Sequence, residues 1–113
     1  MTVMQASETV SSATGLPPGA PFAMLTNMAV APHARRRGVG TALMTAALRT
    51  VAVRLDGNPG LVILLAYKHF EPAMRLYGAF GFSPTPWQDP LWLEDVQRGR
   101  LDRQRRVMLA RSL

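Results

Sequence analysis

The chain has 113 residues, of which 48% are hydrophobic and 18% charged, with a formal net charge of +6 and no cysteine. This is enough for one globular domain with a buried core, and it excludes disulfides, zinc–thiolate sites, a metal centre built on the two distant histidines, and a membrane-spanning helix. The basic balance favours an anionic partner, and Lys68 is the only lysine, so the positive charge is carried almost entirely by arginine.

The first part of the chain is predicted to be irregular and then to form a strand and a helix. Residues 1–22 are rich in Ser, Thr, Gly and Pro, which predicts a flexible tail. Residues 23–30 are predicted to be a strand that ends before Pro32. A helix is predicted over 39–55, where apolar residues recur with helical spacing. These residues are Val39, Leu43, Met44, Ala47, Leu48, Val51 and Leu55.

The second part of the chain continues the alternation of strands and helices. Residues 61–67 are uninterrupted apolar residues, as expected of a strand covered on both faces. A short helix is predicted from Pro72 to Phe80, then a connection of about twenty residues, then a strand over 104–113. This last strand places Val107 and Leu109 on one face and Met108 and Ala110 on the other. The order predicts an α/β fold with a parallel strand pair and a right-handed crossover.

A basic segment with two glycines lies between the first predicted strand and the first predicted helix. Gly38 and Gly40 allow a tight turn and a close approach of the backbone to a ligand. The N–H groups from about Arg36 to Thr41 then converge at the positive end of the helix, which is an anion site. The Walker pattern is absent, and the third glycine of a dinucleotide fingerprint would fall at Leu43. The segment therefore favours a diphosphate held by backbone N–H groups.

Two motifs, in this order, resemble those of the GCN5-related N-acetyltransferases (GNAT). Arg35-Arg36-Arg37-Gly38-Val39-Gly40, preceded by Val30-Ala31-Pro32, is similar to the family's acetyl-CoA signature, Arg/Gln-x-x-Gly-x-Gly/Ala. Residues 73–82 are similar to the family's segment Ala-x-x-Leu-Tyr-x-x-x-Gly-Phe. The resemblance covers residues 23–113. It implies the acyl-CoA N-acyltransferase (GNAT-like) fold, a mixed sheet with a splayed parallel strand pair, with acetyl-CoA as acyl donor and no metal.

The resemblance also implies roles for residues in both motifs. Met28, Ala29 and Val30 would pair through their backbone with the pantetheine arm of acetyl-CoA. Tyr77 would lie near the thioester sulfur and protonate the departing thiolate. Lys68 or Arg75 would reach the adenosine 3′-phosphate. The other implied cofactor-binding residues are Ala73 and, around the pyrophosphate, Arg35, Arg36, Arg37, Gly38, Val39, Gly40 and Thr41.

The sequence departs from the family pattern at several places. Phe70 stands where the second motif usually opens with Asn, and Thr26 and Asn27 stand where some relatives place a catalytic glutamate, so no carboxylate base is visible. The region of Trp87 and Trp92 looks similar to acetyltransferases of plastids and cyanobacteria. That subgroup implies a plastid stroma as the alternative to a cytoplasmic location.

The family normally places further strands and helices before the strand predicted at residues 23–30. We therefore expect an N-terminally truncated form of the fold, with a tail over 1–22 and a domain over 23–113. The predicted strand would then expose its backbone edge and an apolar face. We expect either that a partner chain, such as a second copy in a homodimer, covers this edge, or that the sequence is a truncated product or a partial gene model.

The expected function is transfer of an acetyl group from acetyl-CoA to an amine, with no membrane partner. The acceptor is a protein N-terminus, a lysine or a small-molecule amine. One alternative is a catalytically inactive fragment that binds acetyl-CoA or dimerises. Another is a basic nucleic-acid-binding module, which ranks lower because the arginine clusters at 35–37 and 98–111 lack interleaved aromatic residues.

Overall fold

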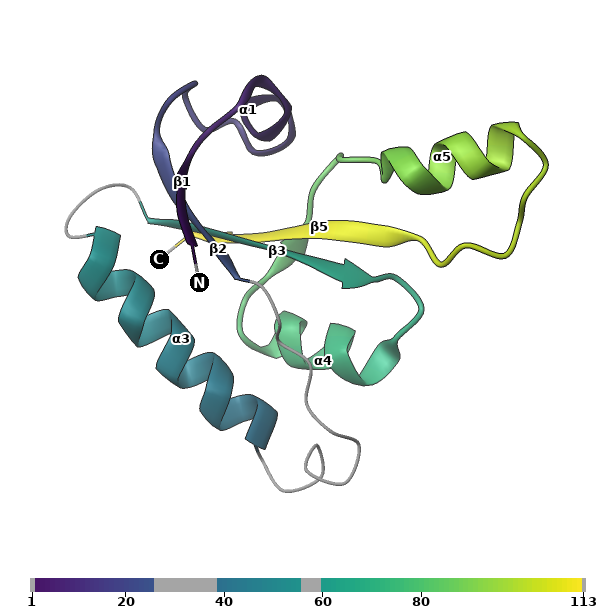
Figure 1. Cartoon of the computed structure of the whole chain (residues 1–113). Helices are drawn as coiled ribbons and strands as arrows, with labels where there is room; N and C mark the ends of the chain where they lie inside the picture. Colours follow the sequence, from purple (N-terminus) through teal and green to yellow (C-terminus); the bar gives the residue numbers. More distant parts are fainter. Residues whose placement is uncertain (1, 26–38, 56–59, 113) are drawn as a thin grey trace.

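The computed structural model describes residues 2–25, 39–55 and 60–112, with the side chains of Val39, Gly40 and Leu55 left aside. Strands and helices alternate along most of the chain (Figure 1). In chain order they are β1 (Thr2–Gln5), α1 (Glu8–Thr14), β2 (Pro21–Leu25), α3 (Val39–Leu55), β3 (Leu61–Tyr67), α4 (Glu71–Ala79), β4 (Ser83–Pro84), α5 (Pro90–Gln97) and β5 (Arg106–Ser112).

The strands form one mixed sheet in the order β1-β2-β3-β5-β4. β2 and β3 run parallel, with Ala23 opposite Val62 and Leu25 opposite Leu64. β3 pairs antiparallel with β5 along its whole length, from Leu61 to Tyr67. The α/β class, the mixed sheet and the parallel pair are confirmed, and β3 has the predicted bounds. The predicted strand over 23–30 is present at 23–25, and its remaining residues lie outside those described.

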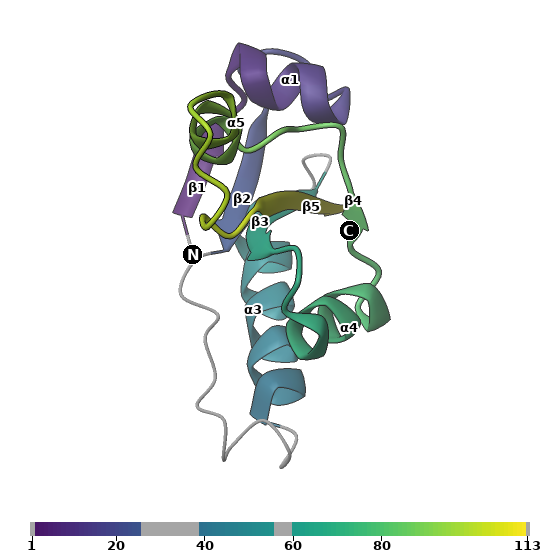
Figure 2. The same cartoon turned by 90° about the vertical axis from the view of Figure 1, so that its right-hand side faces the viewer.

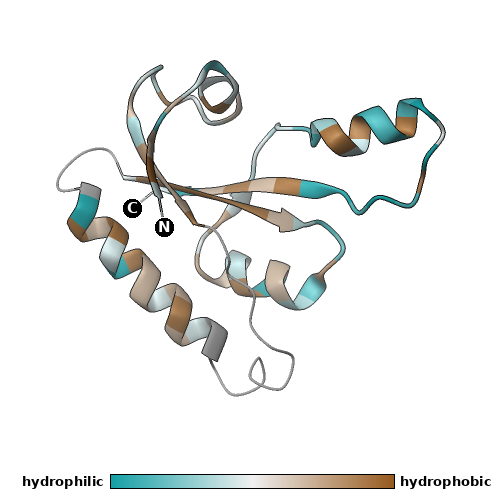
Figure 3. Ribbon diagram, viewed as in Figure 1, coloured by the Kyte–Doolittle hydropathy of each residue, from teal (hydrophilic) through white to brown (hydrophobic). Residues whose placement is uncertain are grey.

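Helices cover both faces of the sheet (Figures 1 and 2). α3 and α4 lie on one face, where Val62 and Leu64 of β3 join Met44 and Val51 of α3 in a buried cluster. α1 and α5 lie on the other face, where Ile63 is buried in a second cluster. Figure 3 shows the apolar character of the central strands between these layers. Neighbouring residues of β3 therefore serve opposite cores, which explains its uninterrupted apolar run.

The apolar face of α3 is narrower than the sequence predicted. Met44 and Val51 are fully buried, and Ala47 and Leu48 pack against the same cluster. Leu43 is 45% exposed, so its placement on the buried face was wrong. The side chains of Val39 and Leu55 lie outside the described part. α3 thus contacts the sheet through one narrow stripe of its middle turns.

The segment predicted to be a tail contains a strand and a helix. β1 pairs antiparallel with β2 over four positions. The Ser7 hydroxyl caps α1 by accepting from the Val10 N–H at 3.3 Å, and Gly15 ends the helix with a positive φ of 78°. Val10 is buried against Phe22 in the second cluster. β1, rather than β2, therefore forms this edge of the sheet, contrary to the prediction.

The connection expected between Phe82 and the last strand contains β4 and a second unpredicted helix, α5. Asp89 caps α5 by accepting from the Leu91 N–H at 3.1 Å, and Pro90 occupies the first helical position. Both residue types are typical of helix starts. The single Asp-Pro step, placed among loop-forming prolines, was the available sequence signal for this helix.

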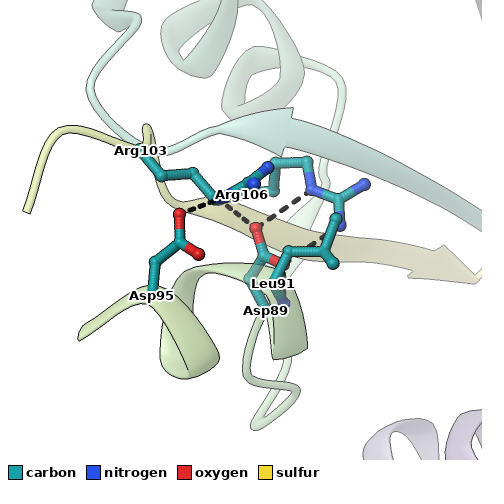
Figure 4. Close-up of polar contacts among 5 residues, drawn as sticks. All are labelled: Asp89, Leu91, Asp95, Arg103 and Arg106. Carbon is teal, nitrogen blue, oxygen red and sulfur yellow. Dashed lines mark hydrogen bonds and ion pairs between the residues drawn. The ribbon is translucent and has the colours of Figure 1, made fainter. Parts of the chain in front are cut away.

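A buried carboxylate joins α5 to the start of β5 (Figure 4). Asp89, which is completely buried, accepts from the backbone N–H of Arg106 at 3.1 Å and from its guanidinium at 3.0 Å through each carboxylate oxygen. The Arg106 guanidinium holds the pKa of Asp89 down at about 2, against the opposing effect of burial. Asp95 and Arg103 add a second contact at 2.7 Å between the same two segments.

We predict that Asp89→Asn destabilises the protein by about 2 kcal/mol at neutral pH. This figure follows from the pKa of Asp89, which folding lowers from 3.8 to about 2. Because the pKa is lowered on folding, this stabilisation is present above pH 4 and is lost as the pH falls towards 2. The difference between wild type and Asp89→Asn in urea unfolding should therefore shrink over that interval. Glu71→Gln, which removes an exposed ion pair, is the control and should change stability little. A pH-independent difference for Asp89→Asn would contradict the prediction.

Candidate active site

The carboxyl ends of the parallel strands β2 and β3 define the candidate site, and we call this end of the sheet the functional edge. Their carboxyl ends, at Leu25 and Tyr67, lie on the same side because the strands run in the same direction. Ligands of open α/β sheets bind outside the carboxyl ends of such strands. α4 begins at Glu71, directly after the turn that follows β3. Backbone geometry thus brings the second predicted motif to this edge.

The amino-terminal end of α3 has the electrostatics of an anion site. α3 is 17 residues long, has no acidic residue in its first turn and has Arg54 in its last turn. Thr41 is exposed in the first turn, and its carbonyl accepts from the Thr45 hydroxyl at 2.9 Å. The positive end of the helix dipole is therefore not opposed by a carboxylate of the helix itself. A phosphate group fits this helix end.

The structure places some of the predicted cofactor residues and leaves others outside its description. Val39 and Gly40 form the first turn of α3 through their backbone, Thr41 is exposed beside them, and Ala73 lies half-buried on α4. The predicted residues outside the described part are Met28, Ala29, Val30, Arg35, Arg36, Arg37 and Gly38.

Tyr77 lies on the face of α4 that packs against the sheet. Its side chain is 7% exposed and belongs to the same buried cluster as Ala66, near the carboxyl end of β3. Its ring meets Phe82 edge to face, with centroids 6.3 Å apart. Ala73, one turn earlier, packs against the same cluster. The predicted tyrosine is thus packed in the core between α4 and the sheet.

The two predicted partners of the 3′-phosphate differ in how they are held. Arg75 is ion-paired with Glu71 at 3.0 Å on the exposed side of α4. Lys68 is exposed, and its backbone N–H donates to the Arg105 carbonyl at 2.9 Å. Glu71 also places a negative charge in the first turn of α4. Of the two helices at this edge, α3 therefore offers the better anion site.

On the α5 side of the sheet, the carboxyl half of β3 is open. Leu65 is 37% exposed and Tyr67 52% exposed, whereas Ile63 on the same face is fully buried. The prediction that this strand is covered on both faces therefore holds for its amino half only. A second molecule can reach the carboxyl end of β3 from this face while α4 covers the other.

No group of three or more His, Cys, Asp or Glu side chains in the described ranges could hold a metal ion. In the same ranges no helix has both the length and the apolar character needed to cross a membrane.

These features define an α/β sheet with the architecture of an acyl-CoA N-acyltransferase. Residues 3–84 match the family model of the acetyltransferase (GNAT) domain, and the chain belongs to this family. The match begins in β1, so residues predicted to be a tail belong to the family domain together with β2, α3, β3 and α4.

A solved structure shows the same fold. The crystal structure of Arabidopsis thaliana NAA60 in complex with a bisubstrate analogue aligns with a TM-score of 0.66 at 16% sequence identity. The alignment covers 98% of this chain and 60% of that chain, so this chain spans about three-fifths of the length of that relative. No curated protein matches the chain.

The burial of Tyr77 contributes to the stability of the protein whatever the function of this residue. Tyr77→Ala should destabilise the protein by about 3–5 kcal/mol in urea unfolding, because it leaves a cavity in the first cluster. Tyr77→Phe preserves the packing and should cost less than about 1.5 kcal/mol. Tyr67→Ala, at the half-exposed tyrosine, is the matched control and should cost less than Tyr77→Ala. Equal losses for the two alanine variants would contradict the described packing.

Proposed function

We propose that the protein is an acetyl-CoA-dependent N-acetyltransferase acting on an amine. The observation that carries the proposal is the edge formed by parallel β2 and β3, where α3 offers a helix end without acidic residues and α4 presents buried Tyr77. Membership of the acetyltransferase (GNAT) family supports this assignment. So does the fold shared with NAA60, whose structure contains a bisubstrate analogue.

Two parts of the chain would hold acetyl-CoA, which supplies its acetyl group as a thioester. The backbone N–H groups at the start of α3, with Gly38 and Gly40 of the predicted motif, would bind the pyrophosphate. The exposed Thr41 hydroxyl would be an additional donor. The segment 28–30 would pair with the pantetheine arm as an added strand pairs with a sheet edge. Only backbone groups are needed for most of these contacts.

The reaction forms one carbon–nitrogen bond and breaks one carbon–sulfur bond. The neutral amine attacks the acetyl carbon and loses a proton to water, and the departing sulfur gains a proton to become a thiol. Tyr77 would donate this proton from its Oη. A phenol titrates near pH 10 and a thiol near 8.5, so full transfer to a free thiolate is uphill by about 2 kcal/mol. We therefore place the donation alongside cleavage of the carbon–sulfur bond, where it stabilises the charge that develops on sulfur, and the Tyr77 phenolate then regains a proton from water.

The amine would approach from the α5 side, where the carboxyl half of β3 is open. The exposed side chains of Leu65 and Tyr67 would line this approach with apolar surface and one phenolic hydroxyl. α4 occupies the opposite face, so donor and acceptor would meet from different directions. Holding the two reactants in this geometry supplies much of the rate acceleration. The acceptor classes to be screened are protein N-termini, lysines and small amines, and the proposed location is cytoplasmic or plastid stromal.

Acetyl-CoA should raise the thermal stability of the purified chain. At a hundredfold excess over its dissociation constant, a ligand of the native state adds about 2.7 kcal/mol. Thr41→Glu, which places a carboxylate at the positive end of α3, should abolish this stabilisation because the new charge repels the pyrophosphate. Thr50→Glu adds the same charge at the exposed far end of the helix and should leave it intact. Absence of any shift in the wild type would argue against the proposed cofactor site.

Acetyl transfer can be followed by the release of coenzyme A with a thiol reagent, because the chain has no cysteine to interfere. Tyr77→Phe should lower the turnover rate at least about a hundredfold, the lower end of the range for general acid catalysis, and leave the acetyl-CoA-induced thermal shift unchanged. Full activity of Tyr77→Phe would show that Tyr77 is not the acid. Acetyl-CoA binding without turnover on any amine class would favour the inactive-fragment alternative over an enzyme.

A further inference from the structure

A hollow lies away from the proposed active site, between α1 and the loop that follows β4. It has a volume of about 430 Å³ and is open to solvent. One wall is α1, and the opposite wall is formed by Pro86 and Trp87 of the loop between β4 and α5. The residues of α1 that line it are Glu8, Thr9, Ser12 and Ala13.

Both walls are fixed by the core of the protein. α1 is capped by Ser7 and anchored by buried Val10. On the other side, Thr85 bonds to the Met108 carbonyl of β5 through its N–H at 2.9 Å and its hydroxyl at 3.1 Å. The Thr85 hydroxyl also accepts from the Trp87 N–H at 3.4 Å, and the Trp87 ring packs against the second cluster. The hollow is therefore preformed.

The charge of the hollow is negative in a protein whose net charge is positive. Glu8 is the only charged residue lining it, and it is also the only charged residue among the first 25 of the sequence. No ion pair within the described part of the chain includes Glu8 or Asp102. The acidic residues that are ion-paired there are Glu71, Asp89, Glu94 and Asp95. The hollow thus presents an exposed carboxylate that forms no ion pair within the described part of the chain.

The aromatic residue that lines the hollow is Trp87. Both tryptophans of the chain contact guanidinium groups. Arg106 lies 5.9 Å from the Trp87 ring centroid, and Arg105 lies 4.6 Å from that of Trp92. Both distances are within the range of cation–π attraction. The Arg106 charge is compensated by the carboxylate of Asp89, so it opposes a further cation near Trp87 only weakly.

We propose that this hollow is a binding site for an organic cation, a guanidinium or ammonium group at the end of an alkyl chain. Glu8 pairs with the cationic head, the hydroxyls of Thr9 and Ser12 accept its remaining hydrogen bonds, and Pro86 and Trp87 pack against the alkyl part. The cation comes from a side chain of a bound polypeptide or from a small free amine. The site is separate from the carboxyl edge of β2 and β3 and does not depend on acetyl-CoA.

The test is an NMR titration of the ¹⁵N-labelled full chain with a blocked tripeptide containing arginine. We expect shifts concentrated at the amides of Glu8 and Ser12 and at the Trp87 indole N–H. The same peptide with citrulline, which has the shape of arginine without its charge, should shift them little. Glu8→Gln should weaken arginine binding at least fivefold, whereas Asp102→Asn, at another acidic residue that forms no ion pair within the described part of the chain, should leave it unchanged.

Agmatine in place of the peptide distinguishes the two sources of the cation. Equal binding of agmatine indicates that a free amine suffices, and binding of the peptide alone indicates a polypeptide ligand; both support the site. Equal shifts with arginine and citrulline, no weakening by Glu8→Gln, or no shifts at millimolar peptide would each overturn it. The thermal melt of Glu8→Gln, expected to match the wild type, shows that any loss of binding is local.

Discussion

The structure depends on one constraint, which is that β3 is apolar on both faces and hydrogen-bonded to a neighbouring strand on both sides. A strand of this kind is stable only when helices cover both faces of the sheet around it. Val62 and Leu64 require α3 and α4, and Ile63 requires α1. The two helices of the candidate active site are therefore positioned by the same packing that buries the central strand. At the carboxyl end this cover stops on one face, and there the sheet becomes accessible.

The second constraint is polar and acts over a long stretch of chain. Between β4 and β5 the chain leaves the sheet to form α5. The bidentate contact of Asp89 with Arg106 then joins the start of α5 to the start of β5. Tyr67 and Arg106 are directly opposite in the β3–β5 register. The contact therefore also fixes the position of Arg106 and the start of α5 relative to the carboxyl end of β3. A buried carboxylate thus determines the surroundings of the functional edge although it takes no part in the proposed chemistry.

The parts of the fold that could be predicted are those whose burial follows from a hydrophobic pattern within the element itself. The run 61–67 and the helical spacing of 39–55 gave the bounds of β3 and α3, because each has a continuous apolar signal. β1 could not be found in this way, since all four of its residues are exposed and its pairing with β2 depends on distant residues. α1 and α5 have local start signals, Ser7 and Asp89-Pro90, but short helices among prolines and glycines give weak periodicity.

The same distinction between local and long-range signals applies to the candidate site. Ala73 and Tyr77 lie on the sheet-facing side of α4, as their spacing of one turn indicates, and α3 begins at Val39, as the motif requires. The hollow between α1 and Trp87 could not be foreseen, because its walls are distant in sequence and one of them was predicted to be a tail. Sequence motifs of binding sites are local, whereas a hollow between two elements exists only once both are packed.

The single lysine has a consequence for a protein proposed to modify amines. Guanidinium groups stay protonated at neutral pH and do not accept acyl groups, so a surface whose cations are arginines attracts phosphate without offering competing acceptors. Lys68 is the exception, and it stands exposed in the turn immediately after β3. The one lysine of this sequence is thus located beside the end of the sheet where acetyl transfer is proposed. Under the proposed function, self-acetylation of a lysine in this chain would fall on this position.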